Sequence, residues 1–166
     1  MSNNIFSPDF TDYIELLNKH KVEYMLVGGM AVNVHGYRRS TGDMDLFVNP
    51  TEANHSKLKK VHFEFGMFMG EMELLSNFLD TKKFDVYTFG NSPIQIDIMT
   101  ACKGVDFDEA FKLIIKAKIE ETIDVNVIQY KQLIESKVAS GRTRDKADIE
   151  ELEKIRKKDK GKGLSM

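Results

Sequence analysis

The stretch that decides the fold is VGGMAVNVHGYRRSTGDMDLFV, residues 27–48. The apolar run Tyr24 to Val27 leads into it and predicts a buried strand that ends at Gly28-Gly29. The residues after the glycines predict a short helix, and Met44 to Val48 predict a second strand. The chain is therefore expected to run through strand, glycine turn, helix and strand in immediate succession.

Asp43 and Asp45 lie two positions apart where the second strand begins. Because side chains alternate between the two faces of a strand, both carboxylates are expected to point the same way. Two carboxylates side by side repel one another unless a cation or a proton lies between them. Magnesium prefers oxygen ligands and commonly takes one or two carboxylates together with substrate phosphates. The pair therefore predicts a metal site; the alternative is a solvated edge strand with two surface acids.

A third acid, Asp97, lies in the apolar run Ile94 to Met99. Alternation places Asp97 on the face opposite Ile96 and Ile98. Burying an aspartate is costly unless it has a partner. If this strand pairs beside that of Asp43 and Asp45, the three carboxylates could hold two metal ions roughly 3.5–4 Å apart. The alternative is an aspartate bonded to a nearby arginine.

Gly28 and Gly29 predict a seat for phosphate groups. A strand that ends in two glycines where a helix begins leaves backbone N–H groups exposed, with no side chain in the way. The same glycines are also what a tight strand-to-helix turn requires, and the two interpretations are compatible. The stretch thus supplies a phosphate seat followed by a metal-binding strand.

The remaining chain alternates helical and strand patterns. Helices are expected from near Pro8, from Thr51 to Phe65, from Glu71 to Leu79 and near Asp106 (with a strand candidate close behind), and as a C-terminal pair hinged at Ser140-Gly141. Further strands are expected at 84–89 and 94–99, joined by a turn over Gly90 to Pro93, and at 124–128. This order predicts an α+β fold, a single mixed β-sheet of about five strands flanked by helices, with C-terminal helices. Residues 1–155 are expected to form one domain and residues 156–166 a flexible basic tail.

Composition excludes several classes of protein. The 166 residues include 24 basic and 26 acidic side chains, for a net charge of −2, which argues against a surface that grips nucleic acid all over. The single cysteine, Cys102, excludes a disulfide framework within the chain and a cysteine-rich zinc site. Neither a signal peptide nor an apolar run long enough to cross a bilayer is visible, so we expect a cytoplasmic protein with no membrane contact.

Gly28, Gly29, Asp43, Asp45 and Asp97 resemble, in type and order, the signature of the nucleotidyltransferase superfamily, which has the DNA polymerase β-like fold. A fuller set resembles the bacterial branch that contains the AbiEii-type toxin nucleotidyltransferases. That set comprises His35-Gly36, Arg39, Thr41, Lys137, Gly141-Arg142, Asp145 and Asp148. The resemblance spans Val22 to Leu152, whereas the known toxins are generally longer, and no separate acceptor-binding domain is visible.

The resemblance implies a transfer of a nucleoside monophosphate from an NTP donor to a hydroxyl acceptor, with release of pyrophosphate. Asp43, Asp45 and Asp97 would be the catalytic residues and the ligands of Mg²⁺ or Mn²⁺. Five further residues would bind the phosphates of the nucleotide: Gly28, Gly29, Lys137, Arg39 and Thr41. The acceptor (RNA, a protein or a small molecule) has no legible motif, and an antitoxin-like protein is a further partner to consider.

Several of these residues also have simpler interpretations. Arg39 could be a surface residue or orient the acidic cluster, and Lys137 could be a solvated helix-end charge. Asp145 and Asp148 could merely cap and charge the last helix, and His35 is expected to be a packed or capping residue. The alternative function is a catalytically silent module that binds a nucleotide or a partner, such as a toxin–antitoxin component.

Overall fold

The predicted succession of elements is present at residues 24–48. In the computed structural model, which describes residues 8–91 and 93–164, β1 (Tyr24–Val27) leads directly into α2 (Gly28–Val34). The chain returns as β2 (Asp43–Val48), antiparallel to β1, with Val27 opposite Asp45. This pairing brings the glycine turn beside the first residues of β2.

Six strands form one sheet, in the order β3-β4-β2-β1-β6-β5. The other strands are β3 (Val86–Asn91), β4 (Ile94–Met99), β5 (Ile115–Ile119) and β6 (Ile123–Val127). The pairs β2–β4 and β1–β6 are parallel and the rest antiparallel, so the sheet is mixed as predicted. The sheet has six strands rather than about five, because the strand candidate behind the helix near Asp106 does form an edge strand. That strand, β5, is mostly exposed and carries two lysines, so it lacks the apolar run of a buried strand.

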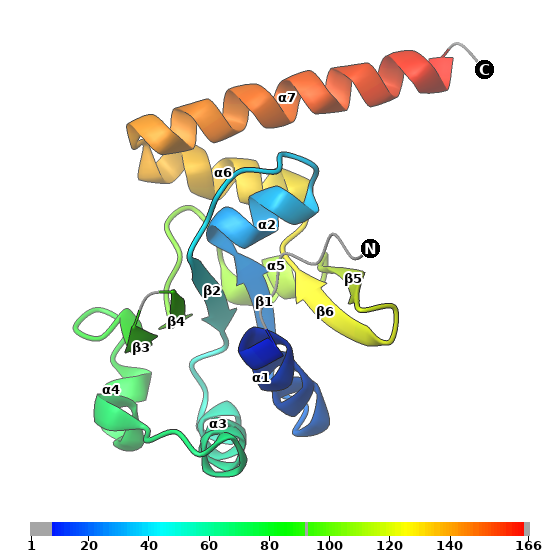
Figure 1. Ribbon diagram of the computed structural model, residues 1–166. Coiled ribbons are helices and arrows are strands. Elements are labelled where there is room, and N and C mark those ends of the chain that lie inside the picture. Colours follow the sequence, from blue (N-terminus) through cyan, green and yellow to red (C-terminus); the bar gives the residue numbers. More distant parts are fainter. Residues whose placement is uncertain (1–7, 92, 165–166) are drawn as a thin grey trace.

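Helices lie at both ends of the sheet (Figure 1). They are α1 (Pro8–Lys19), α3 (Glu52–Phe65), α4 (Leu75–Leu79), α5 (Phe107–Phe111), α6 (Tyr130–Ser140) and α7 (Thr143–Leu164), with a 3₁₀ turn at Gly70–Glu73. In Figure 1, α6 and α7 lie together beyond α2, whereas α3 and α4 lie at the opposite end of the molecule. The end that carries α2, α6 and α7 is also where β2 begins.

Local sequence signals explain several boundaries. Thr51 caps α3 by accepting a hydrogen bond from the Asn54 N–H, and Gly66 ends that helix in the left-handed conformation. Gly141, also left-handed with φ of 65°, ends α6 and separates it from α7. The predicted hinge at Ser140-Gly141 is therefore confirmed.

One predicted boundary is wrong, and the predicted C-terminal tail continues a helix. Gly90 and Asn91 are not turn residues, because they pair with Gln95 and Ile94 and extend β3; Ser92 lies outside the described residues. The tail expected to be loose from residue 156 is helical through Leu164. Lysine and arginine are good helix formers, and a helix anchored at one end extends without an apolar pattern. Residues 165–166 lie outside the described part, and the domain boundary at 155 stays a prediction.

The core packs on both faces of the central strands. It includes the fully buried side chains Tyr13, Leu26, Leu46, Ile98 and Val125, which come from α1, β1, β2, β4 and β6. Along the described ranges, no helix combines the length and the apolar character that a bilayer crossing needs.

Candidate functional site

Three acidic side chains meet where β2 and β4 lie side by side. The two strands are parallel, and Asp45 is the register partner of Asp97, as Asp43 is of Gln95. The Gln95 amide nitrogen lies 3.3 Å from Asp43 Oδ2 and 3.2 Å from Asp97 Oδ1, so one amide bonds to both carboxylates. The strand pairing on which the predicted site depended is therefore present.

The glycine turn touches the same acids. Gly28 has φ of +67°, and a Cβ atom at this position would collide with the Asp45 carboxylate. A Cβ atom at Gly29 would collide with the Thr41 hydroxyl and lie 3.3 Å from Arg39 Nη2. Val27, at the N-cap position of α2, provides no side-chain hydrogen bond to the first N–H groups of the helix. Both glycines are thus needed for close packing as well as for the turn.

Within the described part of the chain, Asp45 forms no ion pair with a lysine or an arginine. Burial, together with the neighbouring carboxylates of Asp97 and Asp43, raises the pKa of Asp45 to about 7, and the more distant Lys137 opposes this only in part. Asp97, by contrast, accepts a hydrogen bond of 2.9 Å from the Thr88 hydroxyl. The three carboxylates are therefore short of positive charge around Asp45.

The donors suit a hard cation in kind, since carboxylate oxygens are the usual ligands of Mg²⁺ and Mn²⁺. The spacing of the three carboxylates, however, does not suit an ion in this structure. Across residues 8–91 and 93–164, no three His, Cys, Asp or Glu side chains stand close enough together to hold an ion. Between Asp43 and Asp97 the structure has the Gln95 amide instead. Holding a cation there would require Gln95 to release these bonds.

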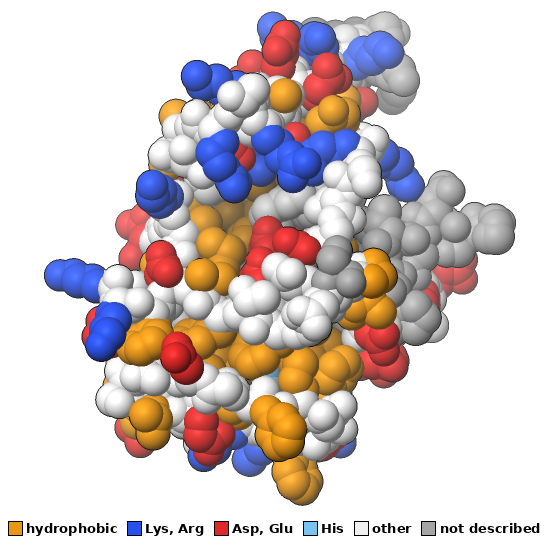
Figure 2. All heavy atoms as spheres, turned by 60° about the vertical axis from the view of Figure 1, so that its left-hand side comes forward, with side chains coloured by type: hydrophobic (Ala, Val, Ile, Leu, Met, Phe, Trp, Pro, Cys, Tyr) orange, Lys and Arg blue, Asp and Glu red, His pale blue; other side chains and the backbone are white. Residues whose placement is uncertain are grey.

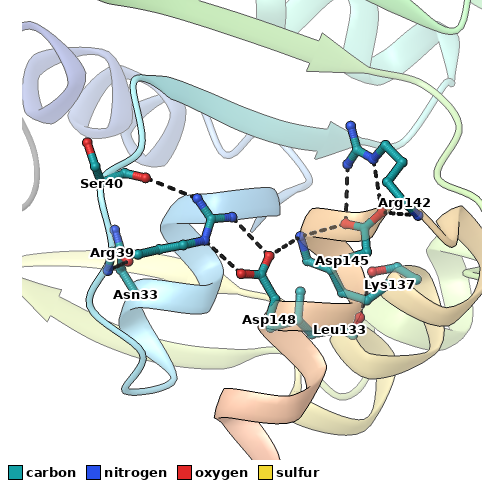
Figure 3. A network of polar contacts seen from close by, with 9 residues as sticks. Asn33, Arg39, Ser40, Leu133, Lys137, Arg142, Asp145 and Asp148 are labelled. Carbon is teal, nitrogen blue, oxygen red and sulfur yellow. Dashed lines mark hydrogen bonds and ion pairs between the residues drawn. The ribbon is translucent and has the colours of Figure 1, made fainter.

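Arginine, lysine and aspartate side chains form a line of alternating charges (Figure 3). Arg39 donates to both carboxylate oxygens of Asp148, at 2.7 and 2.9 Å. Lys137 Nζ lies 3.0 Å from Asp148 and 3.1 Å from Asp145. Arg142 then donates to Asp145 through Nε at 2.9 Å and Nη2 at 3.3 Å. The line joins the loop before β2 to α6 and α7.

Asp145 accepts a hydrogen bond of 3.1 Å from the Arg142 backbone N–H, as a capping residue of the last helix does. Capping is not its whole role, because the side chains of both Asp145 and Asp148 are also buried and ion-paired. Burial alone would raise the pKa of Asp145, but hydrogen bonds from Arg142 and Lys137 hold it at about 2. Burial would likewise raise the pKa of Asp148, but hydrogen bonds from Arg39 and Lys137 outweigh burial and lower it. Arg39 is therefore placed by Asp148 and not by the acids of β2 and β4.

A cavity of about 410 Å³ opens between Asp45 and the helix pair α6 and α7. Its lining includes Gly28 and Asp45 on one side and Lys137, Arg142 and Asp145 on the other. Asp85, Cys102, Lys103, Ser136 and Ser140 also line it. Figure 2 shows acidic side chains in the middle of this face, with a band of Lys and Arg side chains across the end that carries α6 and α7. The cavity therefore joins Asp45, one of the three predicted metal-binding acids, to cationic groups.

His35 lies outside this arrangement. Its Nε2 contacts the Ile128 carbonyl oxygen at 2.8 Å, and its ring packs edge-on against Tyr130. Burial lowers the pKa of His35, so the imidazole is neutral at pH 7. These contacts match the expectation of a packed histidine.

Sequence reasoning assigned no role to Gln95, Thr88 or Lys103. Gln95 left a legible signal, because it lies two positions before Asp97 and must share its face in a strand. Thr88 becomes a partner of Asp97 only through the β3–β4 register. Lys103 had no signal, since only the tertiary structure brings its loop to the cavity.

Comparisons with known proteins bear on this arrangement. A sequence model of the family described as "nucleotidyl transferase of unknown function (DUF2204)" matches residues 7–165. The fold is similar to the crystal structure of a candidate nucleotidyltransferase from Thermotoga maritima, with a TM-score of 0.55 and 13% identity. That similarity covers 93% of this chain and 95% of the other. No curated protein matches the chain.

Proposed function

Because this chain belongs to the nucleotidyl transferase family of unknown function, we propose that it moves a nucleoside monophosphate from an NTP to a hydroxyl acceptor and releases pyrophosphate. The observation that carries the proposal is the juxtaposition of Asp45, its register partner Asp97 and the Gly28 turn. These acids form no ion pair with a lysine or an arginine in the described ranges, and they lie beside a glycine turn. Such a site suits a negatively charged substrate that arrives together with a metal ion.

Asp43, Asp45 and Asp97 would hold Mg²⁺ or Mn²⁺. The ion, when bound, would neutralise the charge of the triphosphate and make a hydroxyl easier to deprotonate. The raised pKa of Asp45 supports this assignment, because a buried carboxylate among like charges gains most from a cation.

The protein's own residues would bind the phosphates and accept the proton of the attacking hydroxyl. The attacking hydroxyl forms a bond to the α-phosphorus as the bond to pyrophosphate breaks, and Asp97 accepts the proton of that hydroxyl. Gly28 and Gly29 would leave room for the phosphates, while Thr41 and Arg39 stay packed beside Gly29. Lys137 would add positive charge behind the leaving group.

Substitution of Asp43 tests the proposal. Each labelled NTP is incubated with the protein, Mg²⁺ and cell extract, and the labelled product is identified. We expect Asp43→Asn to lower transfer at least a hundredfold without loss of thermal stability, since the change removes a like charge from the cluster. Asp108→Asn, an exposed change in α5, is the matched control and should retain full transfer. Transfer that survives Asp43→Asn would refute the assignment.

A catalytically silent module is the second candidate, and the Gln95 amide favours it by bonding to the acids where a cation would be needed. Calorimetry separates the two candidates. NTP binding that is indifferent to Mg²⁺, with no turnover on any acceptor, would establish the silent module. A role in the cytoplasm as an AbiEii-like toxin component, held by an antitoxin-like protein, would appear as a partner in a pull-down.

The incubation with labelled NTPs also identifies the class of acceptor. RNA, protein and small-molecule products separate by size and by nuclease or protease treatment of the labelled fraction. The net charge of −2 gives none of the three an advantage over the whole surface.

A further inference from the structure

We propose that Arg142 and Lys103 grip the triphosphate of the nucleotide in the 410 Å³ cavity, while Lys137 serves as an internal brace between α6 and α7. The inference rests on the proposed function and names the cations that bind its donor substrate. It differs from the expectation drawn from the sequence, which gave the phosphate contact to Lys137.

Lys137 is already committed to other partners. Its side chain is only 6% exposed, and its ammonium group lies within 3.1 Å of both Asp145 and Asp148. An ammonium group has three N–H donors, so these two carboxylates leave it at most one. Moving Lys137 toward a phosphate would also leave two buried carboxylates with less compensation, which is costly.

Arg142, unlike Lys137, is exposed to solvent. Its side chain is 70% exposed although its guanidinium is fixed by the fully buried Asp145. The bonds to Asp145 use one N–H of Nε and one of Nη2, and the five donors of a guanidinium therefore leave three unused. Because the guanidinium is planar, the buried aspartate also sets the direction of those three donors. Arg142 is thus oriented in advance for an anion at the cavity.

Lys103 supplies a second cation from a separate element. It lies in the loop after β4, is exposed, and lines the same cavity as Arg142. No ion pair involves Lys103 within the described ranges. The next residue, Gly104, has φ of +76°, and a Cβ atom there would lie 2.8 Å from Ala139 Cβ. This close approach to α6 keeps the loop, and with it Lys103, at the cavity.

The occupant follows from the chemistry of the lining. Two available cations next to Asp45, for which we propose a metal ion, suit a ligand that carries several negative charges and itself binds divalent cations. A polyphosphate has both properties, and charge-assisted hydrogen bonds to arginine are among the strongest in proteins. The volume of the cavity lies within the usual range for small-molecule sites.

The test uses inorganic tripolyphosphate, because it has no base or sugar, together with each of the four NTPs. Calorimetry with Mg²⁺ is run on the full chain and on Arg142→Gln, Arg142→Lys and Lys103→Gln. Arg144→Gln is the matched control. It removes the same charge two residues after Arg142, and the Arg144 side chain does not line the cavity. We expect the affinity for tripolyphosphate to fall about tenfold or more in each Gln variant at the cavity, partly recovered in Arg142→Lys and unchanged in Arg144→Gln.

Lys103→Gln keeps the test decisive if the loss of a partner for buried Asp145 unfolds Arg142→Gln. Normal tripolyphosphate affinity in folded Lys103→Gln, or an equal loss in Arg144→Gln, would overturn the inference. Failure of the proposed reaction can be told apart from failure of this inference. In that case the wild type turns over no NTP, while the Arg142 and Lys103 variants still lose tripolyphosphate affinity, which supports the inference.

Discussion

The pKa of the Asp45 carboxyl group reflects the charges that surround it. Its pKa is raised to about 7 first by burial and then by the charges of Asp97 and Asp43, while Lys137, held by Asp145 and Asp148, compensates only in part. The folded protein therefore binds this proton more tightly than the unfolded chain does, for which the ordinary value is 3.8. Stability contributed at this site is present below pH 4 and is lost as the pH rises through 7.

This predicts a pH-dependent gain in stability for Asp45→Asn without metal. A shift of roughly three pH units corresponds to at most about 4 kcal/mol, and we expect about 1–3 kcal/mol at pH 8, falling toward zero near pH 4. Urea unfolding with EDTA present measures it, and Asp108→Asn is the control. An Asp45→Asn variant that is no more stable than wild type at pH 8 would show that another group compensates the carboxylate.

At the scale of elements, α7 is attached to the site by charge. Its buried Asp148 lies between Arg39, from the loop before β2, and Lys137 of α6. Ile155 of α7 also packs against Gly36, near the end of α2, where an added Cβ would lie 3.4 Å from it. These contacts explain why the first half of α7 is fixed although the helix has no apolar stripe along its whole length.

Asp148→Asn should therefore destabilise the protein by about 3 kcal/mol, because it leaves Arg39 and Lys137 with less compensation in a buried setting. Chemical denaturation measures the loss. The exposed ion pair between Glu151 and Lys154 offers the control, since Glu151→Gln should change stability by less than about 0.5 kcal/mol. Equal effects of the two substitutions would show that the buried pair contributes no more than a surface pair.

At the scale of the whole molecule, charge is divided unevenly. Residues 130–164 contain eleven basic and seven acidic side chains, whereas the rest of the chain contains 13 and 19. Two of those seven acids, Asp145 and Asp148, are buried against cations. The helix pair is thus the positive part of a chain whose net charge is −2, and Figure 2 shows this band above the acidic centre.

The exposed end of α7 should be dispensable for folding. Residues 158–161 are exposed, whereas Ile155 packs near Gly36 and Arg156 lies over the Tyr130 ring. Truncation after Lys158 is expected to leave the melting temperature within about 2 °C of that of the full chain. A larger loss in calorimetric melting would place these residues inside the domain and refute the predicted boundary at 155.

The sequence by itself determined the local parts of the site. Alternation in a strand places Asp43 with Asp45, and Gln95 with Asp97, while two glycines after an apolar run specify a tight turn. Each of these depends on neighbours a few residues apart. The mixed sheet, the C-terminal helix pair and the family resemblance followed from the same patterns, and the structure and the family match agree with them.

Only the tertiary structure decided which distant groups meet. The pairing of Asp45 with Asp97 joins residues 52 positions apart, and the bond from Arg39 to Asp148 joins residues 109 apart. Asp145 and Asp148 follow Gly141 at the start of a helix, so their local pattern is that of exposed capping residues. They are buried because α7 packs across α6 and the loop before β2, and burial depends on such long-range packing rather than on periodicity.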